Sequence, residues 1–335
     1  MENIMKHAFF GFTCAILTLF LAGCGSGGDS TSSENSTESL QIAVIPKGTA
    51  HIFWKTVHAG AAKAAKETGV EIIWVGPENE GDRRQQIELV QNFISRQVDA
   101  IVLAPTDDSA LVRPVEEAVA RSIPVVVIDS GLKTDKQASF VATDNVEGGR
   151  LGARHLGKVL KGKGNVILLR YQEGSASTTN REDGFLEVMA SDFPDIKLIS
   201  TNQYAGNTKE TAFQASQNLL NKFANVNGIF CVNESAAFGM MRALDTAGKS
   251  GKITLVGFDT SDALLEGMEK GTIAGLVSQD PMDIGYQGVI QAIAAIRGEE
   301  VPERLATRLE MITPENINDP DIKSLIHPDV DKWLD

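Results

Sequence analysis

The sequence predicts an α/β protein made of two similar lobes, each built on a doubly wound parallel sheet. Short apolar runs rich in β-branched residues alternate with helix-like stretches from Leu40 onward, and the alternation continues through both halves of the chain. The length of 335 residues exceeds what one ordinary core fills and suits two domains. A hydrophobic content of 42% with few aromatic residues is typical of a globular chain rather than a disordered one.

Four apolar runs are the strand candidates of the first half: "LQIAVI", "VEIIWVG", "DAIVLAP" and "PVVVID". Their nearly continuous apolar character is typical of strands buried on both faces of a parallel sheet. Between them, "RRQQIELVQNFISRQ" places Ile87, Val90 and Ile94 at i, i+3 and i+7, on one face of a helix. Such an amphipathic helix can cover one face of the sheet.

The second half contains five strand candidates: "NVILLRYQ", "KLISTNQYA", "GIFCVN", "ITLVGFD" and "IAGLVSQ". A helix-like segment follows each of them. Because repeated strand and helix units build a doubly wound sheet, a second sheet and therefore a second lobe are expected.

Polar residues follow the ends of strand candidates in both halves: Lys47, Asp129, Asp144, Asn233, Asp259 and Gln279. In open α/β sheets, ligands bind beyond the carboxyl ends of the strands. Asp and Asn are also common in turns and at helix N-caps, so no single member of the set indicates a site. As a set, they predict a ligand cleft between the two lobes that is lined with hydrogen-bonding groups.

The N-terminus has the pattern of an export signal followed by a lipid attachment site. An apolar run over residues 8–22 follows a short basic start and is too short to span a bilayer comfortably. The signal ends in "LAGC", residues 21–24, which resembles the bacterial lipobox, whose cysteine, here Cys24, is diacylated. Residues 1–23 are therefore the predicted signal peptide and 24–39 a lipidated Gly/Ser-rich tether. The protein is expected to be exported and anchored to a membrane, facing the periplasm or the cell exterior.

Charge and motifs exclude several classes of function. A net charge of -13 without a cluster of Lys and Arg argues against nucleic-acid binding. The sequence shows no metal-ligand cluster, phosphate loop or nucleophile motif, so no metal, cofactor or enzymatic activity is expected. Asp129 and Asp259 are the carboxylate pair that acid–base catalysis would have to use. Cys231 lies in the apolar run "GIFCVN" and is expected to be a small buried hydrophobe.

Several phrases along the chain are similar to one known family: "HIFW", "LAPTD", "VVIDS", "ATDNVEGG", "NREDGF", "VNESAAFG", "ALDTAGKSGKITLVGFDTSDA" and "LVSQDPMDIGYQG". From about Leu40 to Thr313 the chain resembles a periplasmic sugar-binding protein of the ribose, galactose and xylose type. Such proteins have the type I periplasmic binding fold and are the receptor components of ABC importers. A regulator of the LacI type shares this two-lobed core, but the predicted signal and tether occupy the place of its DNA-binding helices.

The resemblance implies three hinge crossings between lobes that close on a sugar. These crossings are expected near residues 142–144, 279–281 and 305–307. They divide the body into an N-terminal lobe of residues 40–143 plus 280–306 and a C-terminal lobe of residues 144–279 plus 307–318. A tail over residues 319–335 extends past the resemblance, and its apolar side chains are expected to pack on the body.

The resemblance also assigns ligand-binding roles to individual residues. Phe53 and Trp54 match the family's aromatic clamp, whose flat faces suit the C–H faces of a sugar ring. Asp129 matches an aspartate whose carboxylate accepts from two neighbouring hydroxyls, and Arg181 matches the sugar-binding arginine. Three further family contacts fall on strand ends: Asn233, Asp259 and Gln279.

Four positions of the expected site depart from the ribose pattern. Lys47 replaces a serine, His51 replaces an asparagine, and Ser130 replaces an arginine. Asn207 stands where the family has an aromatic residue in the second lobe. These four residues are included in the predicted ligand-binding set because they occupy family contact positions.

The charge of the ligand has two alternatives at this point. Lys47, His51 and Arg181 could converge on an anionic group, since charge-assisted bonds to carboxylate or phosphate are strong, and this favours an acidic or substituted sugar. In the other alternative, Lys47 pairs with Asp129 or Asp259 and leaves the site neutral, because an unpaired charge in a closed cleft is costly. The words "IPK" and "DS" also resemble receptors of autoinducer-2 with the same fold.

The sequence therefore predicts a lipid-anchored solute receptor of an ABC importer. It is expected to be a monomer that binds a monosaccharide or a related polyhydroxylated molecule by hinge closure. Its partners would be the ligand, the membrane through the lipid on Cys24, and the transmembrane subunits of a permease. A signalling receptor, read by a sensor instead of a permease, is the alternative.

Overall fold

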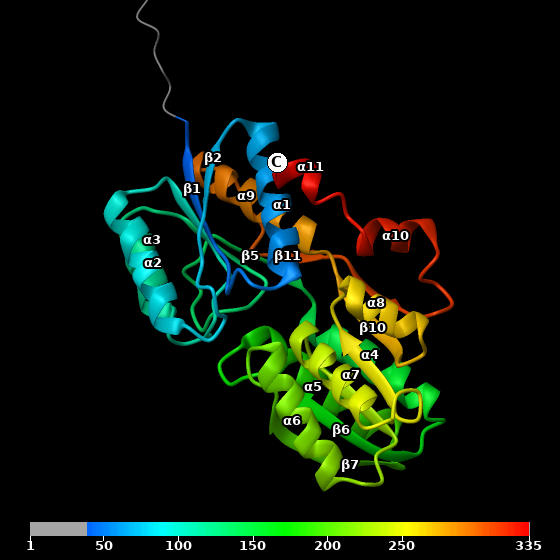
Figure 1. The fold of residues 1–335 in the computed structure, drawn as a ribbon. Coiled ribbons are helices and arrows are strands. Elements are labelled where there is room, and N and C mark those ends of the chain that lie inside the picture. The colour runs from blue at the N-terminus through cyan, green and yellow to red at the C-terminus, as the bar shows by residue number, and fades with distance from the viewer. Residues whose placement is uncertain (1–38, 335) are drawn as a thin grey trace, which may run out of the picture. The chain divides into compact units, whose positions relative to one another are not determined.

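The computed structural model describes residues 39–334, which form two lobes (Figure 1). Each lobe has its own six-stranded sheet. The predicted signal peptide, Cys24 and the tether up to residue 38 lie outside the described residues. Within residues 39–334, no helix combines the length and the apolar character needed to cross a bilayer.

The first sheet is parallel throughout and has the strand order β11-β5-β4-β3-β1-β2. Its strands are β1 (Gln41–Ile45), β2 (Glu71–Trp74), β3 (Ala100–Leu103), β4 (Val125–Ile128), β5 (Ser139–Thr143) and β11 (Arg304–Thr307). One face is covered by α1 (Ile52–Thr68) and α9 (Pro281–Ile296), and the other by α2 (Arg83–Arg96) and α3 (Val112–Ala120). Every residue of β3 and β4 is buried, which is why these runs are apolar throughout.

The second sheet has the equivalent order β12-β10-β9-β8-β6-β7. Its strands are β6 (Gly164–Arg170), β7 (Ile196–Tyr204), β8 (Gly228–Cys231), β9 (Thr254–Phe258), β10 (Ile273–Gln279) and β12 (Leu309–Ile312). Only β12, at the edge, runs antiparallel within this sheet. One face is covered by α4 (Asn145–Val159) and α5 (Ala176–Asp192), and the other by α6 (Lys209–Lys222), α7 (Glu234–Thr246) and α8 (Asp262–Glu269).

Both lobes contain a pair of helices that pack closely through glycines, which supports the predicted similarity between the lobes. Gly60 of α1 and Gly285 of α9 each lie against a backbone carbonyl of the partner helix, so that an added Cβ would overlap it. Gly149 of α4 and Gly184 of α5 do the same in the second lobe, and Gly149 lies against the carbonyl of Arg181. Close backbone approach of this kind requires glycine. The predicted fold class of two doubly wound lobes is confirmed.

The chain passes between the two sheets at three places. The first passage joins β5 to α4, the second joins β10 to α9, and the third joins β11 directly to β12. Because the chain crosses three times, each lobe is built from two separate stretches of sequence, and β11 and β12 from late in the chain form the edge strands of the two sheets.

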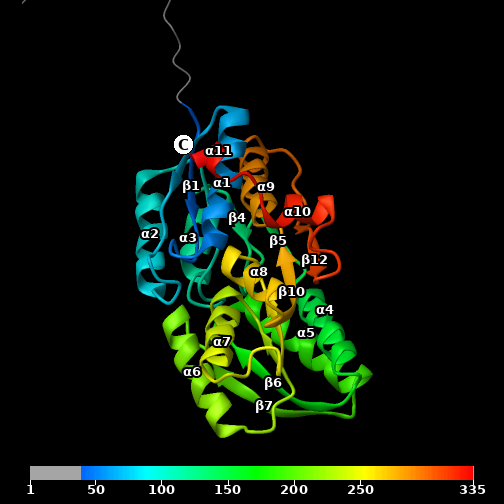
Figure 2. The ribbon, with the colours of Figure 1, turned by 45° about the vertical axis from the view of Figure 1, so that its right-hand side comes forward.

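The C-terminal tail forms a further connection between the lobes. Helix α10 (Pro320–Ile326) packs its apolar side chains into the core of the second lobe. Helix α11 (Asp331–Leu334) lies beside α1 of the first lobe (Figure 2). There, the ammonium group of Lys55 lies 2.9 Å from the carboxylate of Asp331, and Lys63 and Lys66 approach the ring of Trp333.

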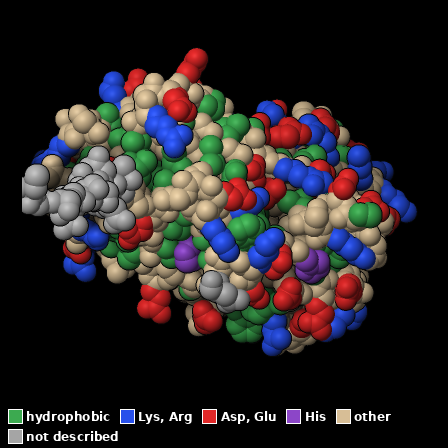
Figure 3. Space-filling model, turned by 90° about the horizontal axis from the view of Figure 1, so that it is seen from above, with side chains coloured by type: hydrophobic (Ala, Val, Ile, Leu, Met, Phe, Trp, Pro, Cys, Tyr) green, Lys and Arg blue, Asp and Glu red, His purple; other side chains and the backbone are tan. Residues whose placement is uncertain are grey.

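The surface in Figure 3, which is seen from above, carries acidic and basic side chains interspersed with one another.

Cys231 is fully buried in the second-lobe core, and burial raises the pKa of its thiol above the usual range. The expectation that Cys231 is a buried hydrophobe is confirmed, since a thiol of raised pKa in an apolar core is unreactive.

Candidate functional site

A polar cavity of about 40 Å³ lies between the two lobes, at the carboxyl ends of both sheets. It is lined by Lys47, His51, Phe53, Trp54, Glu80, Asp129, Tyr171, Ser177, Thr178, Arg181, Asn233, Glu234, Asp259 and Gln279. The structure thus brings together all the predicted site residues except Ser130 and Asn207. Typical ligand pockets measure roughly 300–1,000 Å³, so this cavity is tightly closed by the side chains around it.

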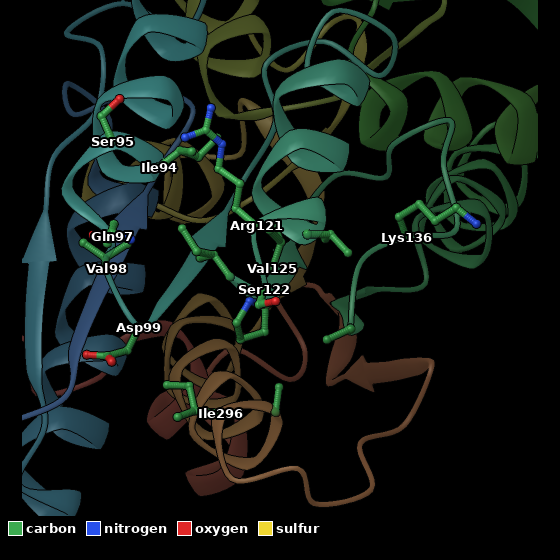
Figure 4. Close-up of a pocket in the computed structure, with 15 residues that line it drawn as sticks. Ile94, Ser95, Gln97, Val98, Asp99, Arg121, Ser122, Val125, Lys136 and Ile296 are labelled. Atoms are coloured by element: carbon green, nitrogen blue, oxygen red, sulfur yellow. The ribbon is translucent and has the colours of Figure 1, made fainter. Parts of the chain in front are cut away.

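A larger hollow of about 680 Å³ lies at the opposite, amino-terminal edge of the first sheet (Figure 4). Its lining mixes apolar residues such as Ile94 and Ile296 with Asp99, Arg121 and Lys136. Size alone does not make it the functional site, because ligands of this type of sheet bind beyond the carboxyl ends of the strands. The smaller cavity has the converging polar groups that recognition requires.

Lys47 lies in the loop after β1 and pairs with Asp129, which follows β4. The ammonium nitrogen is 2.9 Å from Asp129 Oδ2, and both side chains are about 4% exposed. Lys47 also donates to the hydroxyl of Ser177 in the second lobe, at 3.0 Å. Gln86 fixes this loop by donating to the carbonyls of Pro46 and Ala104. The sequence left open whether Lys47 is free to bind an anionic ligand or is paired with an aspartate. The structure shows the pair, and the partner is Asp129.

The aspartates that end β4 and β9 occupy equivalent backbone positions in the two lobes. Asp129 and Asp259 both have positive φ, 60° and 68°, a conformation that is uncommon outside glycine. The backbone amide of each donates to the strand that continues the sheet, at Val141 and Val277. The turn therefore directs both carboxylates into the cavity from opposite sides, and a strained turn of this kind is often found at functional sites.

Arg181 is buried in α5 and faces Asp259. Its guanidinium donates to the side chain of Asn145 at 2.8 Å and to the carbonyl of Val232 at 2.9 Å, and it lies 3.9 Å from Asp259 Oδ2. The ring of Phe258 lies 3.7 Å from the guanidinium carbon. Burial lowers the pKa of Arg181 and raises that of Asp259, and their mutual attraction opposes both shifts.

Asp259 is also the acceptor at the centre of a small network. Gln279, at the end of β10, donates to Asp259 Oδ1 at 2.7 Å, and the backbone amide of Glu234 donates to Oδ2 at 3.1 Å. Gln279 Oε1 is buried and accepts no hydrogen bond from the described residues. A ligand donor is the group that would satisfy it.

Glu80 lies in the loop after β2 and joins the two lobes. The indole nitrogen of Trp54 donates to Oε1 at 2.7 Å, and the hydroxyl of Tyr171 in the second lobe donates to Oε2 at 2.5 Å. Burial together with the nearby carboxylate raises the pKa of Tyr171 well above the usual range. Phe53 meets Trp54 edge to face, with ring centroids 4.9 Å apart. Trp54 is therefore held by its polar edge, which orients both aromatic rings.

His51 lies between carboxylates of different lobes. Its Nε2 is 3.7 Å from Glu80 Oε1, and its Nδ1 is 3.5 Å from Glu234 Oε2. Burial alone would lower the pKa of His51, but the hydrogen bond to Glu234 and the charges on both carboxylates outweigh it and raise the pKa to about 8. Lys209 lies 2.9 Å from Glu234 Oε1. His51 is therefore protonated at neutral pH.

Ser130 and Asn207 each lie close to the cavity but do not line it. The buried hydroxyl of Ser130 accepts from the amide of Ser177 at 3.0 Å and so holds the first turn of α5 against the first lobe. Asn207 lies at the rim, against Gly81, and lines a separate surface hollow with Lys209. Their predicted contact with a ligand stays a prediction.

Sequence reasoning missed five residues that line the cavity: Glu80, Tyr171, Ser177, Thr178 and Glu234. Two of them could have been identified from the sequence, because Glu80 lies in the loop after a strand candidate and Glu234 directly follows Asn233. The polar residues that follow the strand candidates include none from the loop after β2, and of the neighbours Asn233 and Glu234 they include only Asn233. Ser177 and Thr178 lie one helical turn before Arg181, on the same face of α5.

Two doubly wound lobes that enclose a polar cavity between the carboxyl ends of their strands define the class of two-lobed solute-binding proteins. The chain belongs to the periplasmic binding protein family: residues 42–300 match the family described as "Periplasmic binding protein domain". The match includes both lobes and the residues of the cavity.

Named relatives agree with this assignment. The chain is 30% identical over 262 residues to the ribose import binding protein of Bacillus subtilis, which covers 78% of this chain and 83% of that protein. A carbohydrate transporter solute-binding protein from Agrobacterium radiobacter, solved with D-arabinose, shares 34% identity and a TM-score of 0.84 over 87% of this chain and 100% of its own. A solute-binding protein from Agrobacterium vitis, solved with D-fucose, shares 33% identity and a TM-score of 0.82 over 86% and 100%. These relatives are binding proteins of transporters, not enzymes.

Proposed function

We propose that this protein is the lipid-anchored solute receptor of an ABC importer and binds a neutral monosaccharide or a related polyhydroxylated molecule. The names of the relatives support a sugar ligand and a transport role. The proposal includes export by the signal of residues 1–23, attachment through Cys24, and function as a monomer that delivers its ligand to permease subunits.

The observation that carries the proposal is the arrangement of donors, acceptors and aromatic rings around one cavity shared by both lobes. Carboxylates such as Asp129 and Asp259 accept from neighbouring hydroxyls, while Arg181 donates. Phe53 and Trp54 provide apolar surface for ring C–H groups. A sugar combines both kinds of surface, so it matches the site better than a purely apolar or purely charged ligand.

The pairing of charges favours a neutral ligand over an acidic one. Lys47 is paired with Asp129, and Arg181 faces Asp259. A ligand carboxylate would have to displace one of these partners, which would leave a buried charge unpaired. A hydroxyl group can instead insert between paired groups and bond to both.

The binding mechanism we propose is closure around the three passages between the sheets. A cavity of about 40 Å³ is far smaller than a typical ligand pocket and has no room for a sugar while the lobes contact each other across it. The lobes must therefore separate for a ligand to enter, and the ligand then favours the closed arrangement by contacting both sides. A permease can recognise the closed arrangement because only that arrangement brings the two outer surfaces into a fixed relation.

Native mass spectrometry of the mature chain, with Cys24→Ser so that it is purified without lipid, tests the ligand class directly. We expect a retained species with the mass of a neutral sugar or polyol. If the protein purifies without a ligand, thermal-shift screening of D-ribose, D-arabinose and D-fucose follows. A ligand at 100 times its Kd stabilises the folded state by about 2.7 kcal/mol, which raises the melting temperature by several degrees.

Substitutions in the cavity show whether the ligand that raises the melting temperature binds there. Asp129→Asn and Arg181→Lys should abolish most of the thermal shift, whereas Glu269→Gln, an exposed change on α8, should retain it. Absence of stabilisation by any sugar or polyol would contradict the proposal. A shift that survives both cavity substitutions would place binding elsewhere.

A further inference from the structure

Glu234 is a buried carboxylate at the start of α7, and it is the partner of two cations from different elements. His51 Nδ1 of the first lobe is 3.5 Å from its Oε2, and Lys209 Nζ of the second lobe is 2.9 Å from its Oε1. Its side chain is 4% exposed. Burial would raise the pKa of Glu234, but the hydrogen bonds and charges of His51 and Lys209 outweigh burial and lower it. The carboxylate is therefore ionised at neutral pH.

The cations around the cavity are all matched by carboxylates. Lys47 is matched by Asp129 and Arg181 by Asp259, while Glu80 and Glu234 flank His51. An anionic group on a ligand would thus approach several carboxylates without meeting an uncommitted cation among the described residues. Like charges brought together in a desolvated site oppose binding strongly.

Glu234 differs from Glu80 and Asp259 in the groups that it binds. Glu80 accepts hydrogen bonds from Trp54 and Tyr171, and Asp259 accepts from Gln279, so these carboxylates also organise neutral side chains. Neither oxygen of Glu234 accepts a hydrogen bond from a neutral donor among the described residues. Its contacts are the two cations, and both would lose their closest acidic partner if its charge were removed.

We propose that Glu234 is a specificity-determining residue that bars anionic ligands, such as sugar acids, by placing its own carboxylate in the cavity and occupying His51. The inference rests on the proposed function and adds to it the reason why a carboxylate-bearing sugar is rejected. His51 lines the cavity and is the cation that a ligand carboxylate would otherwise use, because charge-assisted bonds to carboxylates are among the strongest in a binding site. Lys209 lines the adjoining surface hollow and binds Glu234 from that side. Replacing Glu234 by a neutral residue of the same shape should convert a rejecting site into an accepting one.

The test compares neutral and acidic sugars on wild type and Glu234→Gln by isothermal titration calorimetry at about pH 7, where His51 is protonated. The neutral probes are D-ribose, D-arabinose and D-fucose, and the acidic probes are D-ribonate, D-arabinonate and D-galacturonate. Wild type should bind at least one neutral probe and reject the acids. Glu234→Gln should bind an acid at least about tenfold more tightly than wild type does, and this gain should weaken as salt is added.

Three variants serve as controls. Glu269→Gln changes the net charge by the same amount on the exposed surface of α8 and should leave the preference unchanged. Glu234→Asp keeps the charge and should still reject the acids. Melting curves show whether Glu234→Gln is folded, and if it is not, Glu234→Ala, which removes the same charge, provides a second test and should show the same gain in affinity for an acid.

The outcomes separate this inference from the proposed function. Wild type that binds an acid as tightly as the matching neutral sugar would overturn the role of Glu234, and so would a folded Glu234→Gln that gains no affinity for any acid. In both cases binding of a neutral sugar by wild type would leave the proposed function intact. Wild type that binds no neutral probe and retains no neutral ligand would instead contradict the proposed function itself.

Discussion

His51 lies between a carboxylate of the first lobe and a carboxylate of the second, so its proton contributes to holding the lobes together. The raised pKa, about 8 against 6.5, means that the folded protein binds this proton more tightly than the unfolded chain does. This shift corresponds to roughly 2 kcal/mol of stabilisation. The contribution is fully present below pH 6.5 and is lost as the pH rises through about 8.

Stability should therefore fall between about pH 7 and pH 9 by roughly 1 kcal/mol more in wild type than in His51→Gln, because part of the contribution is already lost at pH 7. Urea unfolding of both proteins across this range measures the difference. Burial raises the pKa of Glu182 to about 7, but that carboxyl is common to both proteins and cancels in the comparison. Parallel pH profiles for the two proteins would contradict the role assigned to His51.

Individual residues also show where sequence reasoning reached the site and where it failed. Lys47, Asp129 and Asp259 could be predicted because a residue that ends a parallel strand lies at the binding edge whatever the rest of the chain does. Glu80 and Tyr171 could not be predicted as a pair. Their hydrogen bond joins residues 91 positions apart in different lobes, and local patterns carry no information about which residues meet across the cavity.

Most of the regular elements could be predicted from local sequence. The apolar runs became β1 to β4 in the first lobe, and the amphipathic stretch with Ile87, Val90 and Ile94 became α2. The antiparallel direction of β12 and the path of the tail were not predicted. Both depend on where the chain returns after leaving the second sheet, which tertiary packing decides.

Helices α10 and α11 connect the lobes outside the three passages, so α11 should affect opening more than stability. Ending the chain after His327 removes Asp331 and Trp333 but keeps the buried residues of α10. We expect a loss of only about 1 kcal/mol in the free energy of unfolding, because the lost contacts are an exposed ion pair and cation–π contacts. Ligand dissociation should become faster.

Stopped-flow release of a bound sugar, with chemical unfolding as the stability measurement, checks the role of α11. Asp331→Asn is the matched control, because it removes the ion pair with Lys55 and leaves the chain length unchanged. It should fall between wild type and the truncated protein. Unchanged release in the truncated protein would mean that α11 does not restrain opening.

At the scale of the whole molecule, hydrogen bonds join the two lobes both at the cavity and outside its lining. Examples are the bonds from Lys47 to Ser177, from Tyr171 to Glu80, and from the guanidinium of Arg83 to the carbonyl of Glu173 at 2.9 Å. Each of these bonds involves a charged group and contributes about 1.5–3 kcal/mol net, because water replaces the partner when the lobes separate. A balance of this kind lets a bound ligand decide between open and closed arrangements.

A disulfide across the rim tests whether the lobes must separate for exchange. A Cβ added to Gly81 of the first lobe would lie 3.3 Å from Cγ of Asn207 in the second. Because one carbon–carbon bond of about 1.5 Å separates that Cγ from Cβ of Asn207, the two Cβ atoms lie within about 5 Å, close to the roughly 3.5–4.5 Å that a disulfide needs. In a Cys24→Ser background, Cys231 is buried and cannot compete for the new thiols. Oxidised Gly81→Cys/Asn207→Cys should not take up ligand when closed without it, and should retain ligand when closed around it. Reduction with dithiothreitol should restore ligand exchange. Each single cysteine variant is a control and should exchange ligand like wild type. Free exchange by the oxidised protein would contradict the proposed closure, because ligand would then enter without separation of the lobes.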